Sequence, residues 1–256
     1  LSPADDILIR VERALDIDPI GQMIASVLSK KSAIGATHVL IDIPVGPTAK
    51  IRSDIEFFKF KNYFSIVGLA LGLQVYTVKT NGTQPIGCGI GPILEAKDIL
   101  SVLRNNKNSP IDLKRKAISL AGAILEFGSK APSGEGRKLA TSLLENGSAL
   151  KKFIDICEAQ GGFREPVSSS ITKDVVASQN GFVTEIDNRS LAKIAKLAGA
   201  PYSQSAGIEF FSKIGTYIER GDVLFRIHSE STGALDYAFA YAKSLPNIVK
   251  IKSDKI

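Results

Sequence analysis

Three side chains with complementary chemistry recur at one spacing near the start of the chain. Gln22, Ser26 and Lys30 follow one another every four residues. In an α-helix, this interval places side chains on one face. A hydroxyl and an ammonium aligned in this way can hold an anion or the polar edge of a ring. A solvated polar stripe has the same spacing, so spacing alone leaves both interpretations open.

Two more charged residues lie where ligand-facing groups are often found. Asp18 precedes Pro19 at the predicted start of the same helix, which is typical of an N-capping side chain. Lys50 ends a loop containing Gly46 and Pro47 at the exit of a predicted strand. A lysine there can face a ligand, although an ordinary surface lysine is the alternative.

A glycine-rich segment, "GCGIGP", contains Gly87, Gly89 and Gly91. Closely spaced glycines can form a loop whose backbone N–H groups bind phosphate. The segment lacks the GK[ST] ending of a Walker loop and the spacing of a dinucleotide fingerprint. It therefore indicates a tight loop, and only weakly a phosphate site.

These residues need a scaffold, and the first half of the sequence predicts an α/β one. "DPIGQMIASVLSKKSAIG" predicts a helix that stops at Gly35, and the opening "LSPADDILIRVERAL" reads as the approach to a strand. "THVLIDIPVG" and "LQVYTVKT" predict buried strands on either side of a helix over residues 52–71. Ligands of such sheets usually lie beyond the carboxyl ends of the strands.

The second half of the sequence predicts a helical region followed by a different module. Residues 92–160 are mostly helical by pattern, with "SKAPSGEGRK" as an exposed loop. From about residue 166, short β-type runs punctuated by glycine alternate with the helical segments "SLAKIAKLAGA" and a final one. This pattern predicts a second, α+β module.

Composition and charge exclude several classes of protein. The net charge of +6 suits an anionic partner, but the lysines are scattered and few aromatic residues lie among them, which disfavours nucleic acid. Two cysteines and two histidines without ligand spacing disfavour a zinc site or a disulfide framework. No apolar run is long enough for a membrane span and no signal segment is visible, so we expect a cytoplasmic protein.

The motifs taken together resemble those of a known family. "SPADDILIRVERALDIDPIGQMIASVLSKKSAIGATHVLIDIPVGPTAK", followed by "TNGTQPIGCGIGPILEAKDIL", resembles the thymidine and pyrimidine-nucleoside phosphorylases. The resemblance runs from residue 1 to residue 256 and is closest to the branch with archaeal AMP phosphorylases and bacterial thymidine-phosphorylase-like proteins. It implies phosphorolysis, in which inorganic phosphate attacks the anomeric carbon of a nucleoside to give a pentose 1-phosphate and a free base.

The resemblance also implies roles for individual residues. Ser26 and Lys30 would face the base, and Arg10 would be the base-contacting arginine, with Arg13 as the second candidate because a one-residue insertion separates Arg10 from the family spacing. Lys50 matches a nucleotide-contacting lysine of the AMP-phosphorylase branch. Asp18 falls where that branch has its proton donor, so it could be cap, acid or both.

The implied architecture is an α/β fold with a mixed sheet flanked by helices. Residues 1–35 would be the terminal piece of a helical dimerisation domain, residues 36–165 an α/β domain and residues 166–256 a C-terminal α+β hammerhead module. The phosphate-binding residues of the family belong to a segment before residue 1. We therefore expect the C-terminal half of a phosphorylase, with the N-terminal half as partner and a homodimer or higher homo-oligomer as the assembly.

No resident cofactor is expected, since inorganic phosphate is a co-substrate. Some relatives hold potassium near the motif "PIGCGIGPILEAKD", which would here use the carbonyl groups of Ile86 and Gly89 and the carboxylate of Asp98. Asp98 is shorter than the glutamate usual in those relatives, and the other ligands would lie outside this chain. We therefore expect no ordered metal ion here.

Three other functions stay open at this stage. One is phosphorolysis of AMP or another nucleoside monophosphate instead of thymidine, and a second is a non-catalytic fragment that lacks the phosphate site. A third is a lipoyl-type carrier, suggested by "GFVTEI" and "IERGDVLFRI", but no lysine stands at a matching hairpin tip. The choice among bases and 5′-phosphates depends on pocket geometry.

Overall fold

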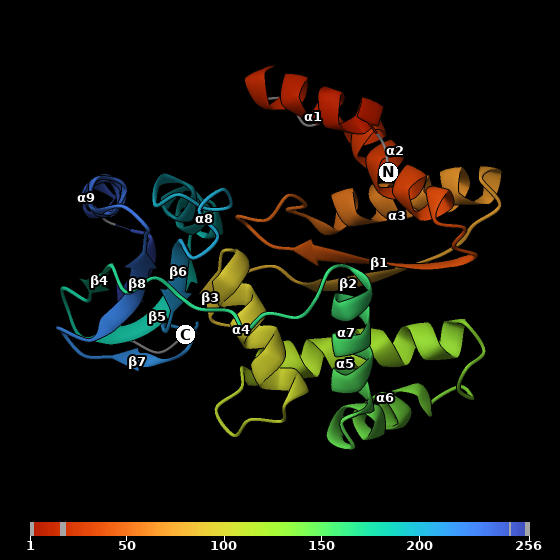
Figure 1. Ribbon diagram of the computed structural model, residues 1–256. Coiled ribbons are helices and arrows are strands. Elements are labelled where there is room, and N and C mark those ends of the chain that lie inside the picture. Colours follow the sequence, from red (N-terminus) through yellow and green to blue (C-terminus); the bar gives the residue numbers. More distant parts are fainter. Residues whose placement is uncertain (1–2, 16–18, 246, 254–256) are drawn as a thin grey trace. The chain divides into compact units, whose positions relative to one another are not determined.

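The computed structural model describes residues 3–15, 19–245 and 247–253, and Figure 1 labels its elements. The helices are α1 (Pro3–Leu15), α2 (Ile20–Ala33), α3 (Asp54–Ala70), α4 (Pro92–Leu103), α5 (Ile111–Phe127), α6 (Gly136–Glu145), α7 (Ser148–Ala159), α8 (Asn188–Leu197) and α9 (Thr232–Ser244). The strands are β1 (His38–Val45), β2 (Gln74–Asn81), β3 (Gly89–Ile90), β4 (Thr172–Val176), β5 (Gly181–Ile186), β6 (Gly207–Phe210), β7 (Tyr217–Ile218), β8 (Val223–His228) and β9 (Val249–Lys252). The chain divides into two compact units, residues 1–81 with 120–137 and residues 82–119 with 138–256.

The opening segment is a helix, so the expectation of a strand approach was wrong. Asp5 and Asp6 lie in the first turn of α1, where the positive end of the helix dipole favours acidic residues. Ile7, Val11 and Leu15 recur every four residues along it. This helical period outweighs the short apolar run that suggested a strand.

The next helix, α2, follows its sequence pattern closely. It begins at Ile20, one residue after the predicted start, and ends before Gly35, whose φ of 72° is a left-handed value that glycine adopts without strain. Ile24 and Leu28 are its buried residues. Asp18 lies outside the described residues.

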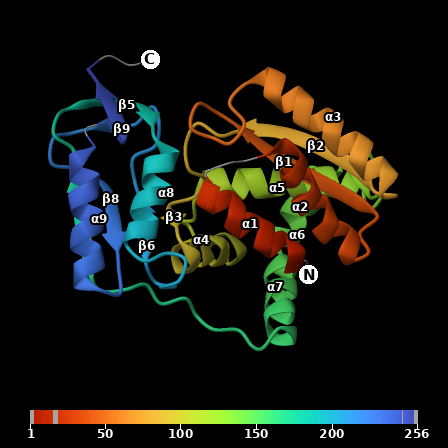
Figure 2. The same ribbon diagram turned by 90° about the horizontal axis from the view of Figure 1, so that it is seen from above.

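In the first unit, β1 and β2 form a two-stranded parallel sheet, in register from His38 opposite Gln74 to Val45 opposite Asn81. Helix α3 connects the two strands, and α2 and α3 pack on the face that buries Val39, Ile41 and Ile43 (Figure 2). The strand, helix, strand prediction is therefore confirmed.

Helix α3 approaches β2 closely because of one glycine. A Cβ atom built on Gly68 would overlap the side chain of Val75. The N-cap residue of α3 is Ser53, whose hydroxyl accepts a hydrogen bond from the backbone N–H of Glu56 at 3.2 Å. On the opposite face of the sheet, the ring of Phe127 lies 5.2 Å from that of His38 and 5.6 Å from that of Tyr76.

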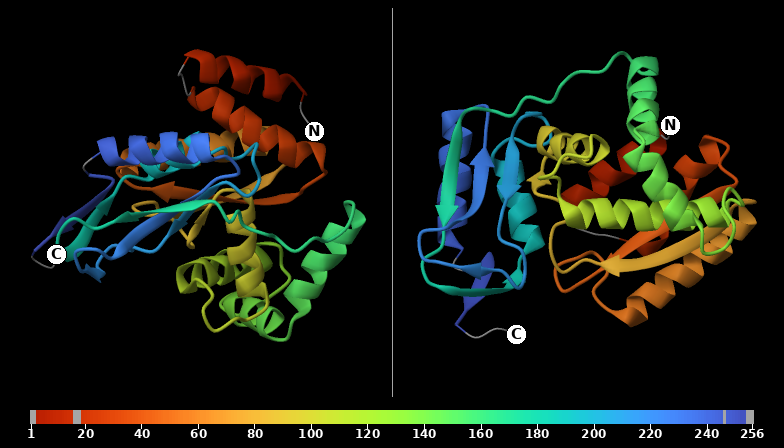
Figure 3. Two further views of the ribbon diagram at one scale, coloured as in Figure 1. Left: turned by 60° about the vertical axis from the view of Figure 1, so that its left-hand side comes forward. Right: turned by 90° about the horizontal axis from the view of Figure 1, so that it is seen from below.

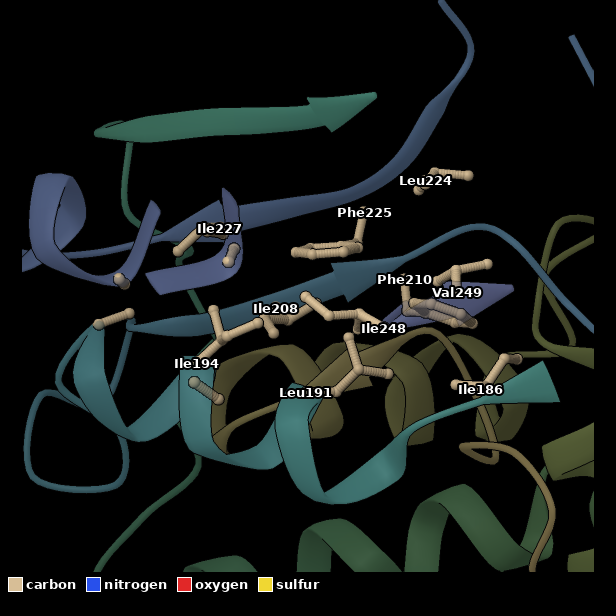
Figure 4. Close-up of a cluster of buried hydrophobic side chains, with 14 of the residues drawn as sticks. Ile186, Leu191, Ile194, Ile208, Phe210, Leu224, Phe225, Ile227, Ile248 and Val249 are labelled. Carbon is tan, nitrogen blue, oxygen red and sulfur yellow. The ribbon is translucent and has the colours of Figure 1, made fainter. Parts of the chain in front are cut away.

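The second unit contains two antiparallel sheets. One has the strand order β3-β6-β8-β4 and the other β7-β5-β9 (Figure 3). The core enclosed by these strands and by α8 and α9 is the larger of the two in the described chain, and Figure 4 shows Leu191 and Ile194 of α8 against Ile208 and Phe210 of β6. The molecule is thus a mixed α/β protein whose small sheets are flanked by helices, as the sequence predicts.

Candidate functional site

The three α2 side chains singled out by their spacing meet a single carboxylate. Asp5 of α1 accepts hydrogen bonds from Ser26 Oγ at 2.9 Å and from Gln22 Nε2 at 3.2 Å. The ammonium of Lys30 lies 2.7 Å from the same Oδ2 atom that Ser26 contacts. We name Asp5, Gln22, Ser26 and Lys30 the α1–α2 cluster; it is an organised polar group, not a solvated stripe.

The electrostatics of the α1–α2 cluster keep Asp5 ionised at neutral pH. Its side chain is 4% exposed, whereas that of Lys30 is 36% exposed. The hydrogen bond from Lys30 is the largest influence and lowers the pKa of Asp5, burial opposes it, and Ser26 and Gln22 lower it further. Lys30 therefore combines a fixed partner on α1 with an accessible ammonium.

The structure describes only some of the other residues that are predicted to contact the base. Arg10 is exposed on α1. The side chain of Arg13 and the whole of Asp18 lie outside the described part of the structure. The roles predicted for Arg10 and Asp18 stay predictions.

Lys50 lies in a short loop at the carboxyl end of β1. The loop closes through hydrogen bonds from Gly46 N to Ile51 O at 3.1 Å and from Ala49 N to Gly46 O at 3.0 Å. The side chain of Lys50 is exposed. Ser26 and Lys30 lie in the second half of α2, which leads into the other end of the same strand, and an eight-residue strand is roughly 25 Å long. Convergence of Lys50 with Ser26 and Lys30 on one cleft therefore stays a prediction.

The glycine-rich loop forms a second organised cluster, in the second unit. Asp98 Oδ2 accepts hydrogen bonds from the N–H groups of Cys88 at 2.6 Å and Gly89 at 2.7 Å. Asp112 accepts one from Gly87 N at 3.3 Å, and Glu95 accepts one from the N–H of Gly91 at 2.9 Å. These donors are satisfied by carboxylates within the chain, so the loop does not offer them to a phosphate.

Lys213, from the loop after β6, holds the carbonyl side of the same segment. Its ammonium donates to Pro85 O at 2.8 Å and Gly87 O at 2.5 Å, and it pairs with Asp112 at 2.8 Å. Burial would raise the pKa of Asp112, but Lys213 and two backbone N–H groups more than offset this and lower it. We name Gly87, Asp98, Asp112 and Lys213 the loop cluster.

The loop cluster bears on the predicted potassium site. Asp98 Oδ2 already accepts two N–H groups, and an ammonium already contacts two carbonyl oxygens of the loop. The carbonyl oxygens that Lys213 contacts belong to Pro85 and Gly87 and not to Ile86 and Gly89, so the predicted potassium site and the expected absence of an ordered metal ion both stay predictions. The described chain also contains no group of three or more His, Cys, Asp or Glu side chains that could hold a metal ion. Burial raises the pKa of the Cys88 thiol, which disfavours a reactive thiolate in this loop.

A pocket of about 570 Å³ lies between α2 and α3 in the first unit. It is lined by Ile20, Gly21, Ile24 and Ala25 of α2 and by Lys59, Tyr63 and Val67 of α3. None of its lining residues belongs to the α1–α2 cluster. The pocket contributes no group to the predicted base site.

Sequence reasoning missed Asp5 and Lys213. Asp5 stands beside Asp6 in the first turn of α1, and only the packing shows that Asp5 is buried while Asp6 is exposed. Lys213 is separated from Asp112 by 101 residues and is one of many lysines. No local pattern marks either residue.

Comparisons with known proteins agree with this architecture. Residues 182–248 match the pyrimidine nucleoside phosphorylase C-terminal domain. A protein of Legionella pneumophila (strain Paris) named "putative thymidine phosphorylase" is 55% identical over 249 residues, which are 97% of this chain and 48% of that protein. Proteins with the same name from Maricaulis maris and Hahella chejuensis are 51% and 50% identical, over 100% of this chain and 49% and 51% of their own lengths.

The chain belongs to the pyrimidine nucleoside phosphorylase family and corresponds to the C-terminal half of its members. The chain spans about half the length of the curated relatives that it matches. No helix among the described residues has both the length and the apolar character needed to cross a membrane.

Proposed function

We propose that the protein containing this chain catalyses the phosphorolysis of a pyrimidine nucleoside, with thymidine as the first candidate. The products are a free base and a pentose 1-phosphate. The observation that supports this is the meeting of Ser26 and Lys30 on one face of α2, in a chain 50–55% identical to proteins named "putative thymidine phosphorylase". Inorganic phosphate and the nucleoside are the proposed substrates, and no resident cofactor is proposed.

The chemistry of phosphorolysis explains why these groups are useful. In the transition state the sugar becomes oxocarbenium-like while the departing base gains negative charge. An ammonium such as Lys30, placed beside the base, stabilises that charge, and a hydroxyl such as Ser26 orients the ring. Protonation of the leaving base by Asp18 would complete the base side, whereas the attacking phosphate would be bound by the other half of the protein.

Assays on the full-length protein test the proposal. Phosphate-dependent release of base should be measured on thymidine, uridine, cytidine and their monophosphates. Lys30→Ala should lower kcat/KM on the preferred substrate by roughly 10²- to 10³-fold, because it removes a group that stabilises the transition state. Lys31→Ala is the matched control, since Lys31 neighbours Lys30 but does not contact Asp5. Equal effects of the two substitutions, or no phosphorolysis of any substrate, would overturn the assignment.

Lys50 supports a second candidate, phosphorolysis of AMP or another nucleoside monophosphate. Lys50 is an exposed cationic residue at the carboxyl end of β1, a position that suits a 5′-phosphate. Under this alternative, Lys50→Ala should lower kcat/KM for the nucleotide by about 10- to 150-fold while changing that for the nucleoside little. Equal losses on both would assign Lys50 to the sugar, the base or the scaffold.

The remaining proposals concern the assembly. We propose a cytoplasmic homodimer or higher homo-oligomer in which the N-terminal half supplies the phosphate site. Residues 1–256 alone should then be inactive, and robust phosphorolysis by the isolated chain would contradict this division. A non-catalytic protein is the alternative if the full-length form is inactive as well.

A further inference from the structure

Helix α3 is apolar on two opposite sides, and the described part of the chain buries only one of them. The inner side carries Phe57, Phe60 and Phe64, which are buried in the core of the first unit. The outer side carries four large apolar residues that are 83%, 62%, 56% and 79% exposed, namely Ile55, Phe58, Ile66 and Leu69. A helix that is apolar all round is normally found in the interior of a protein. The outer side of α3 therefore has the character of a contact surface.

The exposed residues form one continuous stripe with Asn62 at its centre. Positions 55, 58, 62, 66 and 69 follow one another at intervals of three and four residues, which keeps them on one face of a helix. The helix rises by roughly 21 Å over these positions. We name Ile55, Phe58, Asn62, Ile66 and Leu69 the outer α3 stripe. Its spacing is the one that packing against another helix requires.

The pocket between α2 and α3 extends this apolar surface. Its volume is about 570 Å³, and its α3 side is formed by Lys59, Tyr63 and Val67, which stand four residues apart on the flank beside the outer α3 stripe. On the α2 side, Gly21 and Ala25 stand at the same interval. A Cβ atom built on Gly21 would meet no described atom within 4 Å. These small residues leave room for a further element of the protein to approach α2 closely.

The length of the relatives indicates what covers this surface. This chain covers only 48–51% of relatives that it matches over 97–100% of its own length, so they are about twice as long. Exposed apolar surface of this extent marks a contact site. We infer that a helix from the N-terminal half of the full-length protein packs along the outer α3 stripe and places apolar side chains in the pocket between α2 and α3. This inference rests on the proposed assembly of two halves and not on the proposed reaction.

The stripe also defines the chemistry of that helix. Four of its five positions are apolar, so the partner helix carries apolar residues at intervals of three and four. Asn62 becomes buried in the contact, and a buried amide needs a hydrogen-bond partner. The partner helix therefore carries a polar side chain near the middle of its apolar face.

Thiol accessibility in the full-length protein tests whether the stripe is covered. Ile55→Cys and Leu69→Cys place thiols on the outer α3 stripe, and Lys61→Cys places one at an exposed position of the same helix outside the stripe. With a water-soluble disulfide reagent, the thiols at 55 and 69 should react at least about 100-fold more slowly than the thiol at 61, because a covered thiol reacts only when the structure opens locally. The wild-type protein gives the background from Cys88 and Cys157.

Two controls accompany this measurement. Circular dichroism shows that each variant is folded, and in urea the three introduced thiols should react at one rate. Equal rates at positions 55, 61 and 69 in the folded protein would overturn the inference.

A photo-crosslink identifies the segment that covers the stripe. Phe58→p-benzoylphenylalanine in the full-length protein should form a link to a peptide of the N-terminal half of the same polypeptide. Mass spectrometry of the digested product locates the linked peptide, and a mixture of isotope-labelled and unlabelled protein distinguishes links within one chain from links between copies. Links from stripe to stripe between two copies, or no link to the N-terminal half, would overturn the inference. Neither readout requires phosphorolysis, so an inactive protein with a covered stripe would refute the proposed function and leave this contact intact.

Discussion

The two units of the molecule differ in how completely they enclose their apolar side chains. In the second unit, Phe210 and Ile227 are 0% exposed among strands and the helices α8 and α9. In the first unit, α3 leaves Ile55, Phe58 and Leu69 at 83%, 62% and 79% exposure. The buried residues of the second unit therefore stabilise it strongly, whereas these three exposed residues of α3 contribute little to the first unit, because burial determines the free energy that each side chain provides.

The polar clusters differ in a parallel way. In the first unit, the carboxylate of Asp5 accepts a hydrogen bond from the side chain of Ser26 and pairs with the ammonium of Lys30. In the second unit, Asp112 and Lys213 hold backbone groups of a loop. The α1–α2 cluster thus joins polar side chains of two helices, whereas the loop cluster holds the backbone of the glycine-rich loop in place.

The largest effect is expected from the enclosed core. Phe210→Ala should lower the free energy of unfolding by about 3–5 kcal/mol, because it removes a fully buried ring and leaves a cavity. Phe58→Ala, on the outer face of α3, should cost less than about 1 kcal/mol. Equilibrium urea unfolding followed by circular dichroism measures both values, since the chain has no tryptophan. Similar losses of unfolding free energy in the two variants would show that the two units do not differ in how they enclose apolar side chains.

The second largest effect should come from Lys213→Met, which removes one partner of a half-buried ion pair and the hydrogen bonds to Pro85 and Gly87. The expected loss of stability is about 2–4 kcal/mol. Lys250→Met, which breaks an exposed pair with Glu185, is the matched control and should cost under about 1 kcal/mol. A loss no larger than that of the control would show that the loop cluster does not stabilise the second unit.

The pH dependence of stability that comes from Asp112 should become weaker when Lys213 is removed. In the wild type its pKa lies below the usual 3.8, so its contribution is present above about pH 4 and is lost as the pH falls below that value. Without Lys213, the hydrogen bond and the charge that lower this pKa are lost while burial still raises it, so the pKa of Asp112 should be higher in Lys213→Met than in the wild type. The stability of Lys213→Met should therefore fall less steeply than that of the wild type as the pH decreases. Urea unfolding of both proteins between pH 3 and pH 7 would reveal parallel curves if this account is incorrect.

A smaller effect is expected from two glycines with similar backbone angles. Gly87 has φ of 74°, and a Cβ atom there would lie 2.5 Å from Asp98 Oδ2, whereas Gly134 has φ of 84° and open space around it. Gly134→Ala should cost about 1 kcal/mol through backbone strain alone, and Gly87→Ala should cost about 1–2 kcal/mol more. Urea unfolding compares the two variants. Equal losses would mean that Asp98 can move away without cost.

The smallest effect should follow from changes on the outer face of α3. Ile55→Ser and Leu69→Ser should each change the stability of the isolated chain by less than about 0.5 kcal/mol, because neither side chain loses buried area. Both should reduce self-association measured by light scattering, since exposed apolar patches favour it. A loss above about 1.5 kcal/mol for either variant would show that this face is packed and that the contrast between the units is smaller than described.

Much of the fold follows from local patterns in the sequence. The alternating and continuous apolar runs predicted β1 and β2, and the 3.6-residue period predicted α2 and the helices between residues 92 and 160. The strand prediction for the opening segment failed because a run of three apolar residues fits both periods. The four-residue spacing of Gln22, Ser26 and Lys30 correctly indicated one shared face, since helical geometry fixes that face without tertiary contacts.

Tertiary structure decided what the shared face meets. Asp5 and Asp6 are equivalent in the sequence, and only the packing of α1 against α2 buries one and exposes the other. Likewise, the glycines of "GCGIGP" predicted a tight loop, but carboxylates and a lysine distant in the sequence determine that its backbone groups are already satisfied. Local spacing thus predicted which side chains share a face of α2 and where the chain forms a tight loop. Long-range packing selected their partners, because burial and charge pairing depend on residues that no local pattern connects.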